Sequence, residues 1–314
     1  MDTIARSPVK LRPLEQELQH ETLLQRTFRR FRAHRMAVVG VVLLVLITTY
    51  VVGGSFFISE RYANDTDFRN KWAPPSTQHP MGTDAVGRDV LARTIYGGQM
   101  TLIISALAMF VTALLGTVLG LISGYYGGWV DNIIMRVSEA LLCIPLMFLL
   151  LVLTKFVGAQ MSDVRMLGRE FSGSVIVVIF VLGFTGWMGL TRIVRAQVLS
   201  LRTQEFVVAA RALGARNHEI IFRHILPNTL APVIVYTTLG ISNVILLEAY
   251  IGFLGTGVQP PTASWGNMIQ RATEKIDTAW WMWFFPGAFI LLTVISINFI
   301  GDGLRDALDP RSQK

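Results

Sequence analysis

Six long apolar stretches restrict this chain to an integral membrane fold. A helix needs about 20 consecutive apolar residues to cross the hydrocarbon core of a bilayer, and residues 36–58 contain no charged residue at all. This first stretch is too long for a cleaved signal peptide. Only 16% of the 314 residues are charged and 52% are hydrophobic, which is too little charge to cover a soluble surface. We predict an all-α membrane protein with six spans, at residues 36–58, 101–125, 133–157, 173–191, 230–253 and 280–300.

Basic residues are distributed unevenly between the two sides of this predicted membrane. If the amino terminus is cytoplasmic, 18 of the 28 lysines and arginines fall on cytoplasmic segments. The other ten share the outside loops with nine acidic residues, so the outer face is nearly neutral. The positive-inside rule therefore places both termini and the segment 192–223 in the cytoplasm. The net charge of +7 is thus explained by topology, and nucleic-acid binding is not predicted.

The regions outside the spans divide into two tails and an extracytoplasmic loop. Residues 1–35 form a basic cytoplasmic tail, of which 1–21 have a composition typical of disorder. Arginines alternate with aromatic residues from Arg26 to Arg35, which favours a juxtamembrane anchor on anionic lipid; a regulatory or partner contact is the alternative. Residues 59–99 form the outer loop, 100–303 the helical core, and 304–314 the second cytoplasmic tail.

A basic, alanine-rich segment separates the fourth and fifth predicted spans. It runs from Glu205 to Gly214 and is followed by Ile225, Leu226 and Pro227. Alanine and leucine favour helix, and small residues on one face allow another backbone to approach closely. We expect Gly214 to end a turn in the left-handed conformation and Pro227 to stop the helix, because it lacks an amide hydrogen. The segment predicts an amphipathic helix over about 205–222 that docks a soluble partner.

Several motifs along the chain identify a family. They are His79-Pro-Met-Gly-Thr-Asp-Ala-Val-Gly-Arg-Asp-Val-Leu-Ala-Arg93, Gly124-Tyr-Tyr-Gly-Gly-Trp-Val-Asp131, Gly252-Phe-Leu-Gly255, Gln259-Pro-Pro261 with Ser264-Trp-Gly266, and Gly301-Asp-Gly-Leu-Arg-Asp-Ala-Leu-Asp-Pro310. Together they resemble the C-type permease subunit of the dipeptide/oligopeptide ABC importers. The resemblance runs from about Arg29 to Arg311.

The resemblance assigns a coupling role to the alanine-rich segment. In the family, a Glu-Ala-Ala motif followed by a glycine and by Leu-Pro docks into a groove of a cytoplasmic ATPase. Two positions of this chain depart from that pattern, since Val208 replaces the usual glutamate and His224 stands at the isoleucine position. The residues that the resemblance implies for ATPase coupling are Glu205, Ala209, Ala210, Gly214, Leu226 and Pro227.

The family also implies a set of partners. These are a second homologous permease, two ATPase subunits that bind ATP and magnesium, and an extracytoplasmic binding protein, assembled in a bacterial or archaeal cytoplasmic membrane. The chain has no phosphate-binding loop of the Gly-x-x-x-x-Gly-Lys-Ser/Thr type, so it is not expected to bind ATP or to be catalytic. Its five histidines show no metal-binding spacing, and a single cysteine, Cys143, excludes an internal disulfide.

Four polar residues in the spans are candidates for a pathway or gate. Glu139 is an ionisable residue in a span, but Arg136 lies three residues away, and mutual neutralisation is the favoured interpretation. Asn243 and Asn298 can line a polar pathway or tie helices together, and the tie is favoured. Helix rise places Glu248 near the outer surface, where an interfacial carboxylate is favoured over a substrate or proton ligand.

The outer loop contains a charged cluster of Asp84, Arg88 and Asp89, followed by Val90–Ile95, which has the pattern of an amphipathic helix. Local salt bridges are the favoured interpretation of the cluster. A gate brace and a contact for the binding protein are the alternatives.

Two other function classes are compatible with a membrane chain of this kind. An ion-coupled secondary transporter would need acidic residues near the bilayer midplane or broken helices in paired halves, and only Glu139 and Pro145 point in that direction. A non-transporting assembly factor or receptor has no specific support. Within the importer interpretation, the solute is open among dipeptides, oligopeptides, glutathione-like peptides and metal chelates.

Overall fold

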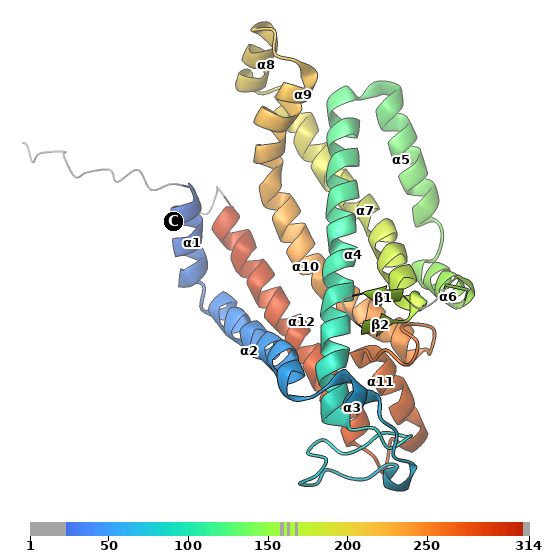
Figure 1. Cartoon of the computed structure of the whole chain (residues 1–314). Helices are drawn as coiled ribbons and strands as arrows, with labels where there is room; N and C mark the ends of the chain where they lie inside the picture. Colours follow the sequence, from blue (N-terminus) through green and yellow to red (C-terminus); the bar gives the residue numbers. More distant parts are fainter. Residues whose placement is uncertain (1–22, 158–159, 162–163, 167–168, 310–314) are drawn as a thin grey trace, which may run out of the picture.

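The chain forms an elongated bundle of long helices (Figure 1). This computed structural model describes residues 23–157, 160–161, 164–166 and 169–309, so the prediction for residues 1–21 lies outside the described residues. Within them, five helices are long and apolar enough to cross a membrane, and a sixth span is obtained if one bent pair is counted together. The five are α2 (Arg35–Phe57), α4 (Val90–Tyr126), α7 (Gly173–Leu201), α10 (Leu226–Phe253) and α12 (Trp281–Leu308).

The third predicted span is bent sharply, which corrects the expectation of one continuous helix over 133–157. Helix α5 (Gly128–Leu142) and helix α6 (Leu146–Phe156) meet at an angle of 80°. Pro145 lies at the break, with an extended backbone (φ −59°, ψ 114°). A proline removes one helical hydrogen bond and disfavours helix at the residue before it, so the chain turns here.

Helices α4 and α7 continue beyond their apolar stretches. The segment Val90–Ile95, predicted as a separate amphipathic helix, is the first turn and a half of α4, and α7 extends ten residues past the predicted end at 191. Tertiary packing, more than local composition, sets the length of such helices. The two helices pack along their length, and this contact maintains the helical backbone outside the apolar zone.

Pro227 does not stop a helix, contrary to the prediction. A single turn, α9 (Asn217–Glu219), leads through the π-helical turn η2 (Ile220–Ile225) directly into α10, so the backbone is helical from Asn217 to Phe253. The amide of Leu226 bonds to the carbonyl of Ile221, five residues back. The wider π turn shifts the hydrogen-bond ladder just ahead of the proline, and Pro227 then occupies the first turn of α10, where its missing donor is tolerated.

Short elements gather at the two ends of the bundle. Helices α3 (Glu60–Asn64) and α11 (Trp265–Ala272) lie at one end, and α8 (Glu205–Ala212) and α9 lie at the other (Figure 1). Helix α1 (Leu23–Ala33) packs beside the carboxyl-terminal half of α12. Two short 3₁₀ turns, η1 (Phe68–Asn70) and η3 (Thr273–Lys275), and an antiparallel strand pair, β1 (Val164–Met166) and β2 (Arg169–Phe171), complete the described elements.

The loop ahead of α4 is held together by buried ionic contacts. The Arg88 guanidinium lies 2.6 Å from the Asp84 carboxylate, and both side chains are almost fully buried. Asp89 caps α4 by accepting a hydrogen bond from the amide of Ala92 at 2.8 Å, and it also contacts His79 Nδ1 at 2.8 Å. The local salt bridge favoured from the sequence is therefore present, and it fixes the start of α4.

Backbone-to-backbone contact joins the far end of α10 to α11. A Cβ added at Gly252 would lie 2.8 Å from the carbonyl carbon of Gly266, and one added at Gly266 would lie 2.7 Å from the Cα of Ala249. Real Cβ atoms do not approach other atoms so closely. Glycine at both positions is thus required for the two helices to touch here.

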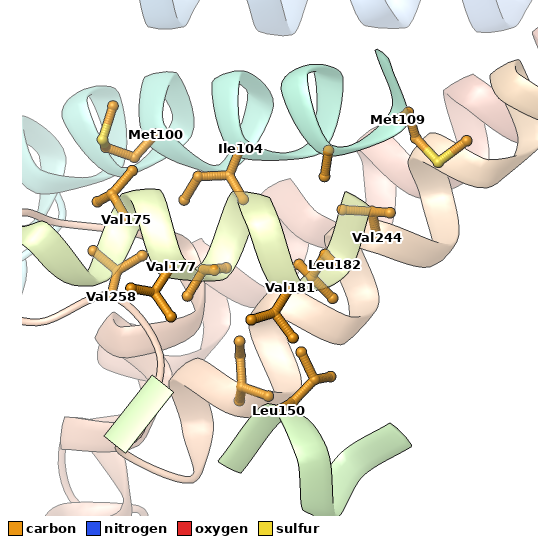
Figure 2. Close-up of a cluster of buried hydrophobic side chains, with 13 residues drawn as sticks. Met100, Ile104, Met109, Leu150, Val175, Val177, Val181, Leu182, Val244 and Val258 are labelled. Carbon is orange, nitrogen blue, oxygen red and sulfur yellow. The ribbon is translucent and has the colours of Figure 1, made fainter. Parts of the chain in front are cut away.

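Helices α4 and α7 form the central contact of the bundle through glycines spaced one turn apart. A Cβ at Gly116 would lie 2.7 Å from the Cβ of Leu190, and a Cβ at Gly120 would lie 2.6 Å from that of Val194. Toward the opposite end of this interface, apolar side chains of α4 and α7 meet, and Leu150 of α6 approaches from the other side of α7 (Figure 2). Small residues let helix backbones approach closely in lipid, where no hydrophobic force drives association.

We expect Gly120→Ala to lower the thermal stability of the detergent-solubilised protein. The added methyl group overlaps Val194, and overpacking of this kind costs about 1–3 kcal/mol. The matched control is Gly287→Ala in α12, where a Cβ meets no atom within 4 Å and alanine improves helix propensity. Unfolding monitored by static light scattering during heating measures both variants. Equal midpoints for the two would contradict the close α4–α7 contact.

Candidate docking site for a partner protein

The alanine-rich segment projects from one end of the bundle, between α7 and α10 (Figure 1). The single helix predicted over 205–222 is shorter in the structure. Helix α8 ends at Ala212, residues 213–216 turn, and the chain re-enters helix at Asn217. The segment is therefore a helix–turn–helix with its turn at the extremity of the molecule.

Gly214 makes this turn possible. Its φ is +84°, a left-handed conformation that side chains with a Cβ rarely adopt. The amide of Gly214 bonds to the carbonyl of Arg211 at 3.0 Å, and the amide of Ala215 bonds to that of Ala210 at 3.1 Å. These two bonds form a Schellman motif, which satisfies the last carbonyls of α8. A Cβ on Gly214 would meet no atom within 4 Å, so the glycine faces open space.

Apolar side chains are exposed on the same segment. Leu213 is 89% exposed, and Val208 and Phe222 are each more than half exposed. Exposed apolar side chains on a projecting element are available for contact with another protein. The remaining predicted coupling residues are arranged around this surface. Glu205, Ala209 and Pro227 are exposed, and Ala210 and Leu226 are partly buried.

One residue of α8 anchors the segment to the bundle. Val207 is fully buried and belongs to a cluster with Val198 of α7 and Ile220 and Ile221 of η2. Beside it, the Tyr125 hydroxyl donates a hydrogen bond to Asn217 Oδ1 at 2.8 Å, and the Arg211 guanidinium lies 5.8 Å from the centre of the Tyr125 ring. The segment is thus seated on the end of α4.

A second set of contacts lies next to this region, at the turn between α4 and α5. Arg195 of α7 donates to both carboxylate oxygens of Asp131, at 2.5 and 2.6 Å, and Ser123 of α4 donates to the same carboxylate at 2.5 Å. Arg202 donates to the carbonyl of Gly124 at 3.2 Å. A bidentate arginine–carboxylate pair fixes orientation as well as distance. These bonds hold the end of α7 that leads into the segment around Gly214 against α4 and α5.

Sequence reasoning missed the Asp131–Arg195 pair. In the sequence, Asp131 is the last residue of a family motif, and Arg195 is one of the basic residues in the segment 192–223. The available signal was that each is a charged residue within a helical turn or two of an apolar stretch. Nothing local, however, indicates that residues 64 positions apart are partners.

The pathway candidates occupy four different environments. Glu139 is exposed and lies 3.4 Å from Arg136. Asn243 is exposed and lines a hollow of about 220 Å³ between α4, α7 and α10. Asn298, on α12, is partly buried and is not among the lining residues of that hollow.

Glu248 is fully buried, which corrects the expectation of an interfacial carboxylate. Its Oε2 accepts a hydrogen bond from Thr101 of α4 at 3.2 Å, and its Oε1 has no partner among the described residues. The amide of Trp265, at the start of α11, donates to Thr101 at 3.3 Å. Glu248 therefore faces the junction of α10, α4 and α11, because its position around the helix axis, which helix rise does not give, turns it inward.

Comparison with known proteins identifies families and relatives that this chain resembles. Residues 116–314 match the family described as binding-protein-dependent transport system inner membrane component, and residues 22–75 match the N-terminal TM domain of oligopeptide transport permease C. The oligopeptide transport system permease protein OppC of Haemophilus influenzae is 37% identical over 301 residues, covering 95% of this chain and 92% of that protein. The dipeptide transport system permease protein DppC of Alkalihalophilus pseudofirmus is 38% identical over 284 residues, covering 90% of this chain and 88% of that protein.

A solved structure supports the fold. A chain of the MetNI methionine ABC transporter, in an inward-facing conformation, aligns with a TM-score of 0.54 and 18% identity, covering 70% of this chain and 98% of that chain.

Among the described residues, no group of three or more His, Cys, Asp or Glu side chains is placed to hold a metal ion.

We expect Asp131→Asn to weaken the packing of the segment around Gly214 against the end of the bundle. In a Cys143→Ser background, Val207→Cys places a thiol in the buried anchor, and its alkylation rate reports local opening. Loss of the charged pair should raise that rate roughly tenfold, the factor that corresponds to about 1.4 kcal/mol of local stability. Glu139→Gln, which removes the exposed Arg136–Glu139 pair, is the control and should change the rate less than about twofold. An unchanged rate in the Asp131 variant would contradict the brace.

Proposed function

Because the chain belongs to the binding-protein-dependent transport system inner membrane components, we propose that it forms half of the solute pathway of an ATP-driven importer for di- or oligopeptides. The observation that carries this proposal is the projecting segment around Gly214, with its exposed apolar surface and its braced seat. The chain supplies the surface to which a separate ATPase binds, and that ATPase provides the energy for transport.

The segment suits this role because it is rigid where it joins the bundle and open where it would meet a partner. Val207 and the Tyr125–Asn217 hydrogen bond hold its base. Its tip presents Leu213 to solvent, together with a glycine that allows a partner backbone to come close. A contact of this kind transmits force, since little of the displacement is absorbed by the element itself.

The proposed mechanism depends on two states of the ATPase pair. ATP-driven closure of two ATPase subunits displaces the docking segments of two permeases, and the helices that follow tilt with them. A partner shifts such an equilibrium only if it contacts the two states differently. The continuous helix from Asn217 to Phe253 connects the docking end to the opposite end, where Gly252 touches α11. This helix is the element that carries the movement across the bundle.

The proposal includes the partners and the orientation. A second permease completes the pathway, two ATPase subunits bind ATP and magnesium, and an extracytoplasmic binding protein delivers the solute. The segment around Gly214 and both chain termini face the cytoplasm, in accord with the excess of basic residues there and with the position of α1 and the end of α12 toward the α8 end of the bundle. This chain itself carries out no chemical reaction.

Val208 gives the docking contact a different chemistry from the usual motif. It stands where the resemblance places a glutamate, and its side chain is 53% exposed on α8. An exposed valine offers apolar contact in place of a carboxylate, so we propose that this permease binds its ATPase with more apolar and less ionic character at this position. The ion-coupled alternative has no support among the relatives.

We expect Gly214→Phe to abolish ATPase binding and peptide uptake while membrane insertion is retained. The bulky side chain would occupy the space where the partner backbone docks. Gly128→Phe is the matched control, because Gly128 also has positive φ (+56°) and open space around its Cβ position, so both changes impose similar backbone strain of about 1–3 kcal/mol. ATPase recovered with the tagged chain is the readout. Equal recovery for the two variants would contradict the docking role.

The orientation is tested by thiol labelling in a Cys143→Ser background. Leu213→Cys, at the tip of the segment, should react with a membrane-impermeant maleimide only in inverted vesicles, and bound ATPase should protect it. Phe68→Cys, at the opposite end and 62% exposed in the parent chain, should react only in right-side-out vesicles. The reverse pattern would overturn the topology, and labelling of Leu213→Cys that is unaffected by ATPase would overturn the docking contact.

A further inference from the structure

The hollow lined by Asn243 has the character of a ligand site within the bundle. It has a volume of about 220 Å³ and is an open hollow lined by residues of α4, α7 and α10 and by the first residue of α6. Sites for small molecules in helical bundles are concave and mostly apolar, with a few polar groups that fix orientation. Here those groups are Asn243, Tyr236, Thr185 and Thr112.

Of the four polar side chains, Thr112 and Thr185 are already hydrogen-bonded within the protein, whereas Asn243 and Tyr236 are available to a ligand. Thr112 donates its hydroxyl hydrogen to the carbonyl of Gly183 at 3.0 Å, and Thr185 donates to that of Val181 at 2.8 Å. Within the described part of the chain, the side chains of Asn243 and Tyr236 make no hydrogen bond. The asparagine amide offers both donors and an acceptor, and the phenol hydroxyl offers one donor and an acceptor.

Among the residues that the structure describes, none that lines the hollow is charged. All twelve lining residues are uncharged, so it has no ionic preference of its own. A charge at this position would attract oppositely charged solutes and repel similarly charged ones. A site that passes peptides of varied sequence has to recognise what they share, and the shared group is the backbone amide, with one N–H donor and one C=O acceptor per residue.

The hollow continues toward the docking end of the bundle. A second hollow, of about 560 Å³, shares Tyr236 and Leu239 with the first and reaches Arg305 and Asp309 at the end of α12. Of the described lining residues, the charged ones are Arg305 and Asp309, near the end of the bundle. The two hollows together form one surface along α10.

We propose that the Asn243 hollow is a peptide-backbone subsite, in which the Asn243 amide and the Tyr236 hydroxyl bind a backbone amide of the passing peptide. Its uncharged lining makes passage indifferent to the charge of the peptide side chains. This inference rests on the proposed function and adds the chemical group that the pathway recognises.

The test compares uptake of neutral, acidic and basic dipeptides by the complete transporter in proteoliposomes with its binding protein. Asn243→Leu should lower uptake of all three by a similar factor of up to about tenfold, which corresponds to loss of hydrogen bonds to a shared group. Asn243→Asp keeps the shape and adds a charge, so it should reduce uptake of the acidic dipeptide relative to the basic one by at least about tenfold. Thr238→Val, on the same helix but outside the lining, should leave uptake unchanged.

Two results separate the inference from the proposed function. If the wild-type transporter takes up no dipeptide, the proposed function fails and the subsite fails with it. If wild-type uptake is normal but Asn243→Asp leaves the acidic-to-basic ratio unchanged, or Asn243→Leu and Thr238→Val behave alike, the subsite alone is overturned. Assembly with the ATPase, measured on the same preparations, should be the same for all variants, and a loss of assembly in the Asn243 variants would also overturn the subsite.

Discussion

The close contact between α4 and α7 is the constraint on which the other features depend. Glycines at positions 116 and 120 let the two helices approach until side chains of one lie against the backbone of the other. That approach brings Arg195 within reach of Asp131 at one end of the pair. It also forms two walls of the hollow at Asn243, through Thr112 and Thr185. In lipid, helix association rests on such packing and on a few hydrogen bonds, so the spacing between α4 and α7 sets both the seat of the docking segment and the width of the hollow.

The sequence predicted the existence of the spans better than their ends or shapes. Apolar length reports how much chain lies in a membrane, and five of six predicted spans are single helices in the structure. It does not report where helix continues beyond the apolar zone, as α4 does back to Val90 because Asp89 caps it there. Proline rules had opposite outcomes. Pro145 turns the chain, whereas Pro227 is accommodated by a π turn. The sequence rule says that proline disfavours a helix, but the hydrogen bonding of the neighbouring backbone decides whether the helix breaks.

The helix that begins at Glu205 and its left-handed glycine were predicted from the sequence, but the residues that support them were not. Small residues, a glycine and a following proline indicate a helix that other proteins approach, and the glycine is indeed in the left-handed conformation. Asn217 of the docking segment bonds to Tyr125 of α4, and the two residues are 92 positions apart. Pairing over such distances is set by helix packing, which periodicity and composition do not encode. The inward position of Glu248 has the same origin, because rise along a helix gives height and leaves rotation about the axis open.

The glycine contact between α10 and α11 has a mechanical consequence. No side chain stands between the two backbones at Gly252 and Gly266, so there is no rotamer whose change could take up a small displacement. The helix that ends there runs from Asn217 to Phe253, a rod of roughly 55 Å at the usual rise of 1.5 Å per residue. Pivoting such a rod by ~5° about one tip moves the other by roughly 5 Å, close to one helical pitch. Because no flexible side chain at this contact can absorb movement, a small rotation of the long helix would displace α11 by about the same distance as the helix tip.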